Sequence, residues 1–358
     1  MAHRRHHTPF GMRNNCTGFY PVLDQSHILL IHEWIGYLLN GFAFFLNLFL
    51  IYLVITRSHK MKNMRPLLLT GAIVDANYAL FNGIHNTYFV ISHQNVILIM
   101  NSMYTSTYAM TTLFRTLAGS TVALSWLCVP FQVSYRHYLI RSGSPPPASF
   151  LIIHAVIIGG LSLIGSSLIY AVYQPLYISF LCEMREAIGS LGLELTDTRL
   201  SAGKYDTEVL QYYLVFFTGI SVGSILIVFA IEKRVRQYLH LKEKIMSKRT
   251  RRMHSELNKA LFFMALSPII SNVSQTLYVS TAVYLNFDNR ILDCISSLLA
   301  VTGPLINGFT TIYFVHPYRN FFLGVLSSNF EDSTKNELVI SEDSFTKSSR
   351  AGNNMVSL

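Results

Sequence analysis

The feature that most constrains this chain is a strongly basic stretch, residues 232–259, between two long apolar runs. The stretch holds ten Lys and Arg residues against three acids. The runs, about 209–231 and 260–285, are each long enough to cross a hydrocarbon core, which takes ~20 apolar helical residues. Because short loops rich in Lys and Arg stay on the cytoplasmic side, we expect this stretch inside, with a helix leading outward from each of its ends.

The composition supports a membrane protein rather than a soluble one. Only 13% of the 358 residues are charged and 51% are hydrophobic, whereas a soluble domain has roughly 25% charged residues. The net charge of +9 is concentrated in loops, so it indicates topology in a lipid bilayer and not a nucleic-acid partner. The first ~27 residues contain no apolar core of a signal peptide, so the first span is expected to direct insertion itself.

Seven apolar runs fit a seven-helix bundle with its N-terminus outside. Of the 28 Lys and Arg residues, twenty fall in segments assigned to the inside, seven in segments assigned to the outside, and Arg115 within a run. Residues 316–322 are expected to form a short amphipathic helix on the inner membrane surface. The predicted spans are about 35–55, 67–91, 111–134, 149–171, 209–231, 260–285 and 291–315.

The predicted organisation has three parts. Residues 1–32 form an extracellular tail, residues 33–323 the all-α receptor-like bundle with its amphipathic helix, and residues 324–358 a disordered cytoplasmic tail. Asn15 begins an N-x-T sequon, which can be glycosylated only if this end faces the lumen.

Two short motifs carry a resemblance to a known family. The segment PFQVSYRHY (130–138) ends the third run, and PYR (317–319) follows the seventh; Asn47 with its Leu/Ile-rich surroundings also fits. In this order the motifs resemble those of nematode serpentine chemoreceptors of the Str/Srd-like superfamily, class delta or a neighbouring class, over residues 35–323. Tyr135 stands where an acid usually precedes the Arg, so the acid that would lock Arg136 from that position is missing.

The resemblance implies a G-protein-coupled receptor in the plasma membrane, at sensory cilia, that binds a small odorant-like ligand and activates a heterotrimeric G protein. A seven-helix ligand-gated cation channel subunit, expected with its N-terminus inside, and a small-molecule transporter are the alternatives; an accessible glycan on Asn15 would exclude the channel. No catalytic motif is present, and we expect no enzyme activity, cofactor or metal.

Three polar residues share one depth in the predicted membrane. Asn47, Asp75 and Asn307 each lie eight residues from the inner end of their run, roughly 12 Å at the rise of an α-helix. A carboxylate there is costly unless paired or solvated, so we expect a shared activation network that includes Pro304. A bound cation, a protonated Asp75 and a purely structural hydrogen-bond cluster remain open alternatives.

The inner ends of the runs supply candidate contacts for a G protein. Arg136 ends the third run, where its donors could bind carbonyl groups at a partner's helix C-terminus; an ordinary positive-inside arginine is the alternative. The predicted G-protein-facing residues are Tyr135, Arg136, Lys233, Arg234, Arg251, Arg252, Tyr318 and Arg319.

The outer halves of the runs supply candidates for a ligand pocket between helices. The alternative for each is a packing role between helices, and Arg115 could instead snorkel or pair with an outer-loop acid. The mixture of an apolar wall with few polar groups suits a small, largely uncharged molecule. The candidates are Asn82, His85, Asn86, Met110, Arg115, Tyr212, Gln275, Tyr278 and Asp293.

The four cysteines allow one outer disulfide. Cys182 lies in the long loop assigned to the outside, and Cys16 is its expected partner, with Cys294 as the rival. Cys128 is expected to be a plain core residue.

Overall fold

The computed structural model describes residues 26–58, 62–92, 95–100, 108–172, 174–175, 188, 200–204, 208–242, 262–263, 266–267, 269–287 and 289–324. Within these ranges, six helices are long and apolar enough to cross a membrane. They belong to α1 (Ser26–Arg57), α2 (Arg65–His85), α3 (Tyr108–Ser142), α4 (Ala148–Val172), α6 (Glu208–Lys242) and α9 (Arg290–Phe314). The predicted 260–285 span contains the π-helix η3 (Ile269–Val273) and α8 (Ser274–Leu285).

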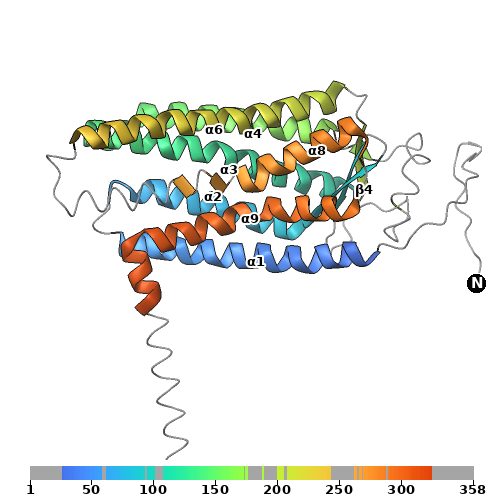
Figure 1. The fold of residues 1–358 in the computed structure, drawn as a ribbon, viewed down its shortest axis with the longest axis horizontal. Coiled ribbons are helices and arrows are strands. Elements are labelled where there is room, and N and C mark those ends of the chain that lie inside the picture. Colours follow the sequence, from blue (N-terminus) through green and yellow to red (C-terminus); the bar gives the residue numbers. More distant parts are fainter. Residues whose placement is uncertain are drawn as a thin grey trace, which may run out of the picture.

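These helices run side by side along the long axis of the molecule (Figure 1). α1 packs against α2 and α9, while α3 contacts α2, α4 and α6 and so lies at the centre. The outward faces carry large exposed apolar side chains, such as Ile152 and Val156 on α4 and Val215 on α6. A water-soluble protein rarely exposes so much apolar surface, whereas a bilayer covers it with lipid. The outward faces are therefore lipid-facing.

A small antiparallel sheet lies across one end of the bundle, the end assigned to the outside (Figure 1). β1 (Thr87–Ser92) and β2 (Asn95–Met100) form a hairpin, and β4 (Leu200–Lys204) and β3 (Gln174–Pro175) extend it in the order β1-β2-β4-β3. Thr87 is opposite Met100, and Ile97 is opposite Ala202. β1 also packs on α8 and α9. The segment after α2 therefore folds into a sheet that covers the outer end of the helix bundle.

The prediction for the second span was wrong at its outer end. α2 stops at His85 and not near residue 91, because Asn86 adopts a left-handed conformation (φ 41°) and caps the helix with its N–H on the Asn82 carbonyl. The following TYFVIS sequence, rich in β-branched and aromatic residues, forms β1. Because Tyr88–Ile91 continues the apolar run without a break, hydrophobicity alone did not mark the end of the helix.

Other boundaries differ more simply. α1 begins at Ser26, inside the segment predicted as tail, and α3 continues two turns beyond residue 134 to Ser142. α6 continues to Lys242, so the start of the predicted basic loop is helical. α4 and α9 match their predicted spans within one residue. Residues 316–324 are helical and turn away from the axis of α9, as expected for a helix on the membrane surface (Figure 1).

Candidate ligand pocket and activation network

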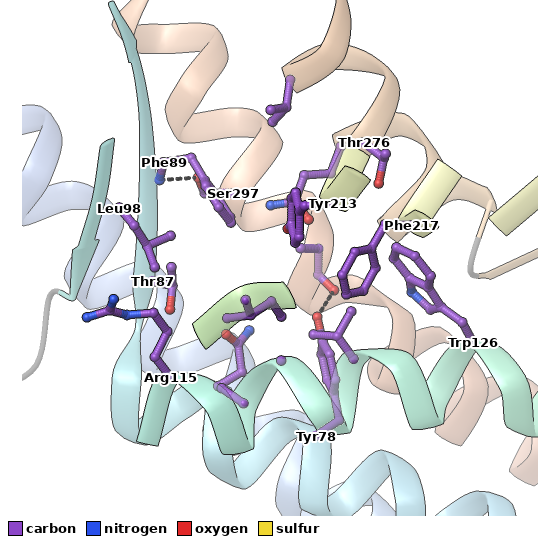
Figure 2. A pocket seen from close by; sticks show the side chains of 18 of the residues that line it. Tyr78, Thr87, Phe89, Leu98, Arg115, Trp126, Tyr213, Phe217, Thr276 and Ser297 are labelled. Atoms are coloured by element: carbon purple, nitrogen blue, oxygen red, sulfur yellow. Dashed lines mark hydrogen bonds between the residues drawn. The ribbon is translucent and has the colours of Figure 1, made fainter. Parts of the chain in front are cut away.

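A cavity of about 110 Å³ lies in the outer half of the bundle, below the sheet (Figure 2). Its walls come from α2, α3, α4, α6, α8 and α9, and the sheet contributes Thr87, Phe89 and Leu98. Most of the wall is apolar or aromatic, including Trp126, Tyr213 and Phe217. Each of the surrounding helices therefore presents part of its inward face to the same space.

The α3 wall follows from helical periodicity. Arg115, Ala118, Gly119, Val122 and Trp126 all line the cavity, and their spacing of three or four residues places them on one face. Of this stripe, only Arg115 was among the residues predicted to line the pocket. Continuing from Arg115 in steps of three and four would have found Trp126.

Three of the predicted pocket residues line this cavity, namely Asn82, Arg115 and Gln275. Tyr212 does not: it is 60% exposed on the outward face of α6, and its neighbour Tyr213 lines the cavity instead. The prediction chose the wrong one of two adjacent tyrosines, because neighbouring helical positions point about 100° apart. The side chain of Met110 lies outside the part that the structure describes.

His85 and Asn86 are buried at the outer end of α2 and do not line the cavity. Asn86 is the cap residue described above, and its side-chain amide donates to the Glu33 carbonyl at 2.8 Å. This bond joins α2 to α1, which passes close to it at Gly36: a Cβ on Gly36 would collide with the Asn86 side chain. Asn86 therefore joins α2 to α1 and does not line the ligand cavity.

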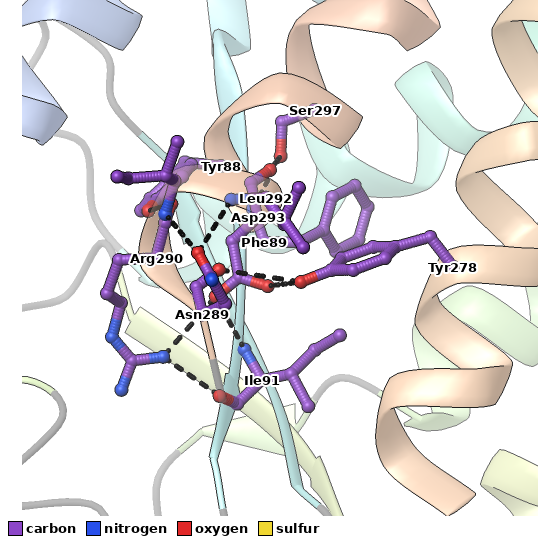
Figure 3. A network of polar contacts seen from close by, with 10 residues as sticks. Tyr88, Phe89, Ile91, Tyr278, Asn289, Arg290, Leu292, Asp293 and Ser297 are labelled. Atoms are coloured by element: carbon purple, nitrogen blue, oxygen red, sulfur yellow. Dashed lines mark hydrogen bonds and ion pairs between the residues drawn. The ribbon is translucent and has the colours of Figure 1, made fainter. Parts of the chain in front are cut away.

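Asp293 joins the sheet to two helices (Figure 3). Its carboxylate accepts the Tyr278 hydroxyl at 2.8 Å and the Ile91 N–H at 3.3 Å, and it pairs with Arg290 Nη1 at 3.3 Å. Arg290 also donates to the Ile91 carbonyl at 2.8 Å, and Tyr88 donates to the Arg290 carbonyl at 3.1 Å. We call Tyr88, Ile91, Tyr278, Arg290 and Asp293 the outer clasp. Tyr278 and Asp293 belong to this clasp and do not line the cavity.

The outer clasp also fixes the cover of the cavity. The Phe89 N–H donates to Ser297 Oγ at 3.1 Å, and Ser297 in turn donates to the Asp293 carbonyl at 2.9 Å. Burial, together with the charge of Asp293, raises the pKa of the Tyr88 phenol, so this hydroxyl remains a donor. Since Phe89 and Ser297 both line the cavity, the clasp and the pocket share a wall.

Of the three residues predicted at matching depth, Asp75 and Asn307 are hydrogen-bonded to each other, and Asn47 is bonded to α9 at Pro304, three residues before Asn307. Asn307 Nδ2 donates to Asp75 Oδ2 at 3.1 Å, and Asn47 Nδ2 donates to the carbonyls of Ala43 and Pro304 at 2.9 and 3.1 Å. All three side chains are buried. The amide oxygens of Asn47 and Asn307 are buried without a donor among the described residues. This inner polar core, defined as Asn47, Asp75 and Asn307, therefore has unused acceptors.

Pro304 shapes the adjoining part of α9. It has no N–H, so the carbonyl of Ala300, four residues earlier, lacks its usual helical donor, and the Tyr78 hydroxyl donates to that carbonyl at 2.9 Å. One residue before the proline, the Gly303 carbonyl accepts Ser267 Oγ at 2.9 Å. A side chain at Gly303 would meet Ser271 Oγ at 2.8 Å, so glycine permits this close approach. Pro268, a residue type that favours a kink within the predicted sixth span, lies outside the described residues.

At the inner end, Arg136 is fully buried. Its Nη1 lies 3.9 Å from Glu232 Oε2 on α6, and Glu232 also accepts Arg236 Nε at 3.1 Å. Glu232 was not predicted as a partner of Arg136; the signal for it is that the helix of the fifth span continues past residue 231. The acid absent before Arg136 is thus supplied by another helix.

The other predicted G-protein contacts separate into buried and exposed residues. Tyr135 is buried and donates to the Asn63 carbonyl at 3.0 Å, and the buried Tyr318 hydroxyl is hydrogen-bonded to Ser58. Burial raises the pKa of Tyr318. The exposed or part-exposed members are Lys233, Arg234 and Arg319.

Several predictions fall on residues that the structure does not describe: Arg251, Arg252, Asn15, Cys16 and Cys182. Cys128 and the rival disulfide partner Cys294 are free, buried thiols. Among the described residues, no group of three His, Cys, Asp or Glu side chains could hold a metal ion.

The sequence has recognisable relatives. A model of the serpentine-type seven-transmembrane GPCR chemoreceptor Srd family matches residues 33–324. The chain belongs to this family. It is 26% identical to Caenorhabditis elegans serpentine receptor class delta-19 over 77% of its length and 82% of the relative's. It is 22% identical to class delta-3 of the same worm, covering 87% of this chain and 92% of that one.

A third match is shorter, and a fourth concerns the fold. Serpentine receptor class delta-18 of C. elegans is 33% identical over 26% of this chain, which spans 27% of that relative's length. The crystal structure of squid rhodopsin superposes with a TM-score of 0.60 over 90% of this chain and 93% of rhodopsin, at 12% identity. This Srd-family protein is therefore a multi-pass membrane receptor with the seven-helix GPCR fold, and not an enzyme.

Proposed function

We propose that this Srd-family receptor binds a small extracellular molecule in the outer cavity and activates a heterotrimeric G protein from its inner end. The observation that carries the proposal is the cavity itself, because its α3 and α6 walls continue directly to the Arg136–Glu232 pair. By family resemblance we place the receptor in the plasma membrane of sensory cilia.

The size of the cavity limits the ligand. An engineered apolar protein cavity of ~150 Å³ holds one benzene molecule, and drug-sized sites run from roughly 300 to 1,000 Å³. The 110 Å³ found here suits a molecule of about six heavy atoms or fewer. Its aromatic and aliphatic wall favours a mainly apolar compound, as an odorant would be. Peptides and nucleotides are too large for this space.

Coupling to the inner end requires a change in the helices that both regions share. Arg136 is buried against Glu232, so its guanidinium faces α6 rather than a cytoplasmic partner. Activation would separate α3 from α6, and the inner polar core on α1, α2 and α9, with its unused acceptors, would rearrange at the same time. A ligand can drive this change only by as much as it binds the active conformer more tightly.

The test is a panel of volatile molecules with six or fewer heavy atoms, applied to cells that express the receptor and a promiscuous Gα. Val122→Phe fills the cavity, and Val222→Phe places the same ring on the 44% exposed outward face of α6. Val122→Phe should abolish the response at equal surface level, and Val222→Phe should keep it. Equal responses from both variants would contradict binding in this cavity.

A further inference from the structure

Trp126 brings an unused hydrogen-bond donor to the cavity. The residue is 4% exposed, and its indole N–H is buried without an acceptor anywhere in the described part of the chain. Its ring packs edge-to-face on Phe217, with centroids 5.3 Å apart and planes at 87°. Figure 2 shows this pair at one side of the cavity, with the indole nitrogen on the edge nearer the other lining residues. Buried donors without an acceptor are rare in folded proteins.

Four of the other polar residues around the cavity differ from Trp126; a fifth, Arg115, is also donor-only but is charged, and its Nη2 donates to Met100 Sδ at 3.9 Å. The hydroxyls of Tyr78 and Ser297 already donate to the carbonyls of Ala300 and Asp293. The amides of Asn82 and Gln275 each carry both donors and an acceptor, so they cannot select one kind of ligand group. The indole N–H can only donate. It therefore discriminates in favour of a ligand that carries an acceptor.

We propose that Trp126 is a specificity-determining residue and that the ligand is a small oxygenated molecule, whose carbonyl or ether oxygen accepts the indole hydrogen bond. The rest of such a molecule would lie against the apolar wall formed by Val122, Phe217 and Val279. This inference rests on the ligand site of the proposed function and adds the chemical class. A hydrocarbon of the same shape would leave the N–H unsatisfied and bind more weakly.

The sequence allows a direct test, because the chain has two tryptophans. Receptor labelled with ¹⁵N-indole tryptophan and held in lipid nanodiscs gives one indole signal from Trp126 and one from Trp34, which is 62% exposed and serves as an internal control. Trp34→Phe assigns the two signals. The probes are small ketones, esters and ethers, each paired with its hydrocarbon isostere, such as cyclopentanone with methylenecyclopentane.

At least one oxygenated probe should move the Trp126 indole proton signal downfield, and the shift should saturate with concentration. The paired hydrocarbon should bind at least tenfold more weakly, and the Trp34 signal should not change. A Trp126 signal that no oxygenated probe moves would overturn the inference. That outcome is expected if a water molecule accepts the N–H hydrogen bond from a second space of about 20 Å³, which Trp126 lines together with Ser221 and Ser224. Equal binding of both members of every pair would overturn it as well.

A second experiment measures G-protein activation by the Trp126→Phe variant, with Trp34→Phe as the control. Removal of the N–H should raise the half-maximal concentration of an active oxygenated compound by about tenfold and remove its advantage over the hydrocarbon. A Trp126 signal that responds without any G-protein activation would leave this inference standing and reject the proposed function. If compounds activated the G protein without moving the Trp126 signal, and activated the Trp126→Phe variant as well as wild type, the proposed function would stand and this inference would be rejected.

Discussion

Two buried carboxylates of this receptor are held in opposite ways. Asp293, at the outer end, accepts a phenol and a backbone N–H and pairs with Arg290. Asp75, in the inner half, accepts an amide hydrogen bond from Asn307, and the amide oxygens of Asn307 and Asn47 have no donor among the residues that the structure describes. A fully satisfied buried group rigidifies its surroundings, whereas a partly satisfied one is ready to exchange partners. The outer clasp is built as a fixed support, and we propose that the inner polar core is the part that changes during activation.

The inner ion pair follows the same contrast. Arg290 donates to the Ile91 carbonyl at 2.8 Å as well as pairing with Asp293, whereas Arg136 Nη1 lies 3.9 Å from Glu232, beyond hydrogen-bond distance. Both arginines are buried. The outer ion pair is therefore a direct hydrogen bond, and the inner ion pair is a longer contact between two helices.

The largest expected effect comes from breaking the outer clasp. Asp293→Ala leaves Arg290 buried without its carboxylate and Ile91 N–H without an acceptor, so the free energy of unfolding should fall by about 3–5 kcal/mol. A thiol-reactive dye can follow unfolding of the purified receptor, because Cys128 and Cys294 are buried and free. A loss below about 1 kcal/mol would mean that the clasp is not a fixed support.

A smaller loss is expected beside the inner polar core. Tyr78→Phe leaves the Ala300 carbonyl with neither the hydroxyl nor an N–H from Pro304, so stability should fall by about 2 kcal/mol. Tyr284→Phe, at a side chain that is 72% exposed, is the matched control and should change stability by less than about 0.5 kcal/mol. Equal effects from the two variants would contradict the proposed role of the Tyr78 hydroxyl.

The inner ion pair should affect signalling more than stability. Glu232→Gln removes the charge that holds Arg136 on α6, and ligand-free G-protein activation should rise by about tenfold, equivalent to ~1.4 kcal/mol. Arg236→Gln breaks the other ion pair of Glu232, but the Arg236 side chain is 59% exposed, so basal activity should remain near wild type. Nucleotide exchange on the G protein, measured without ligand, distinguishes the two variants. Unchanged exchange with Glu232→Gln would show that the Arg136–Glu232 pair does not hold the receptor inactive.

The smallest effect should come from one bond of the clasp. Tyr278→Phe removes the phenol hydrogen bond but leaves Asp293 with Arg290 and the Ile91 N–H, so about 1 kcal/mol should be lost. The dye assay used for Asp293→Ala measures it on the same scale. If Tyr278→Phe were as destabilising as Asp293→Ala, the clasp would depend on that single bond rather than on its network.

Features set by local sequence were predictable. Hydrophobic runs located α4 and α9 within a residue, and matched depth predicted the contact of Asp75 with Asn307 and that of Asn47 with α9 at Pro304. Features that depend on contacts between distant segments of the chain could not be predicted. The pairing of β1 with β2 and β4, the Arg136–Glu232 contact and the choice of Tyr213 over Tyr212 depend on how helices rotate and where loops fold back. An apolar run does not show how its helix is rotated about its own axis, because lipid and neighbouring helices are equally apolar.

The most direct test of the contrast is to compare Asp75→Asn with Asp293→Asn in one experiment that measures unfolding and ligand-stimulated signalling. Asn at position 75 can still accept from Asn307, so stability should stay within about 1 kcal/mol while maximal signalling changes several-fold. Asn at position 293 has one acceptor oxygen for Tyr278, Arg290 and the Ile91 N–H, so stability should fall. Equal destabilisation by both variants, or unchanged signalling in Asp75→Asn at normal surface level, would contradict the account.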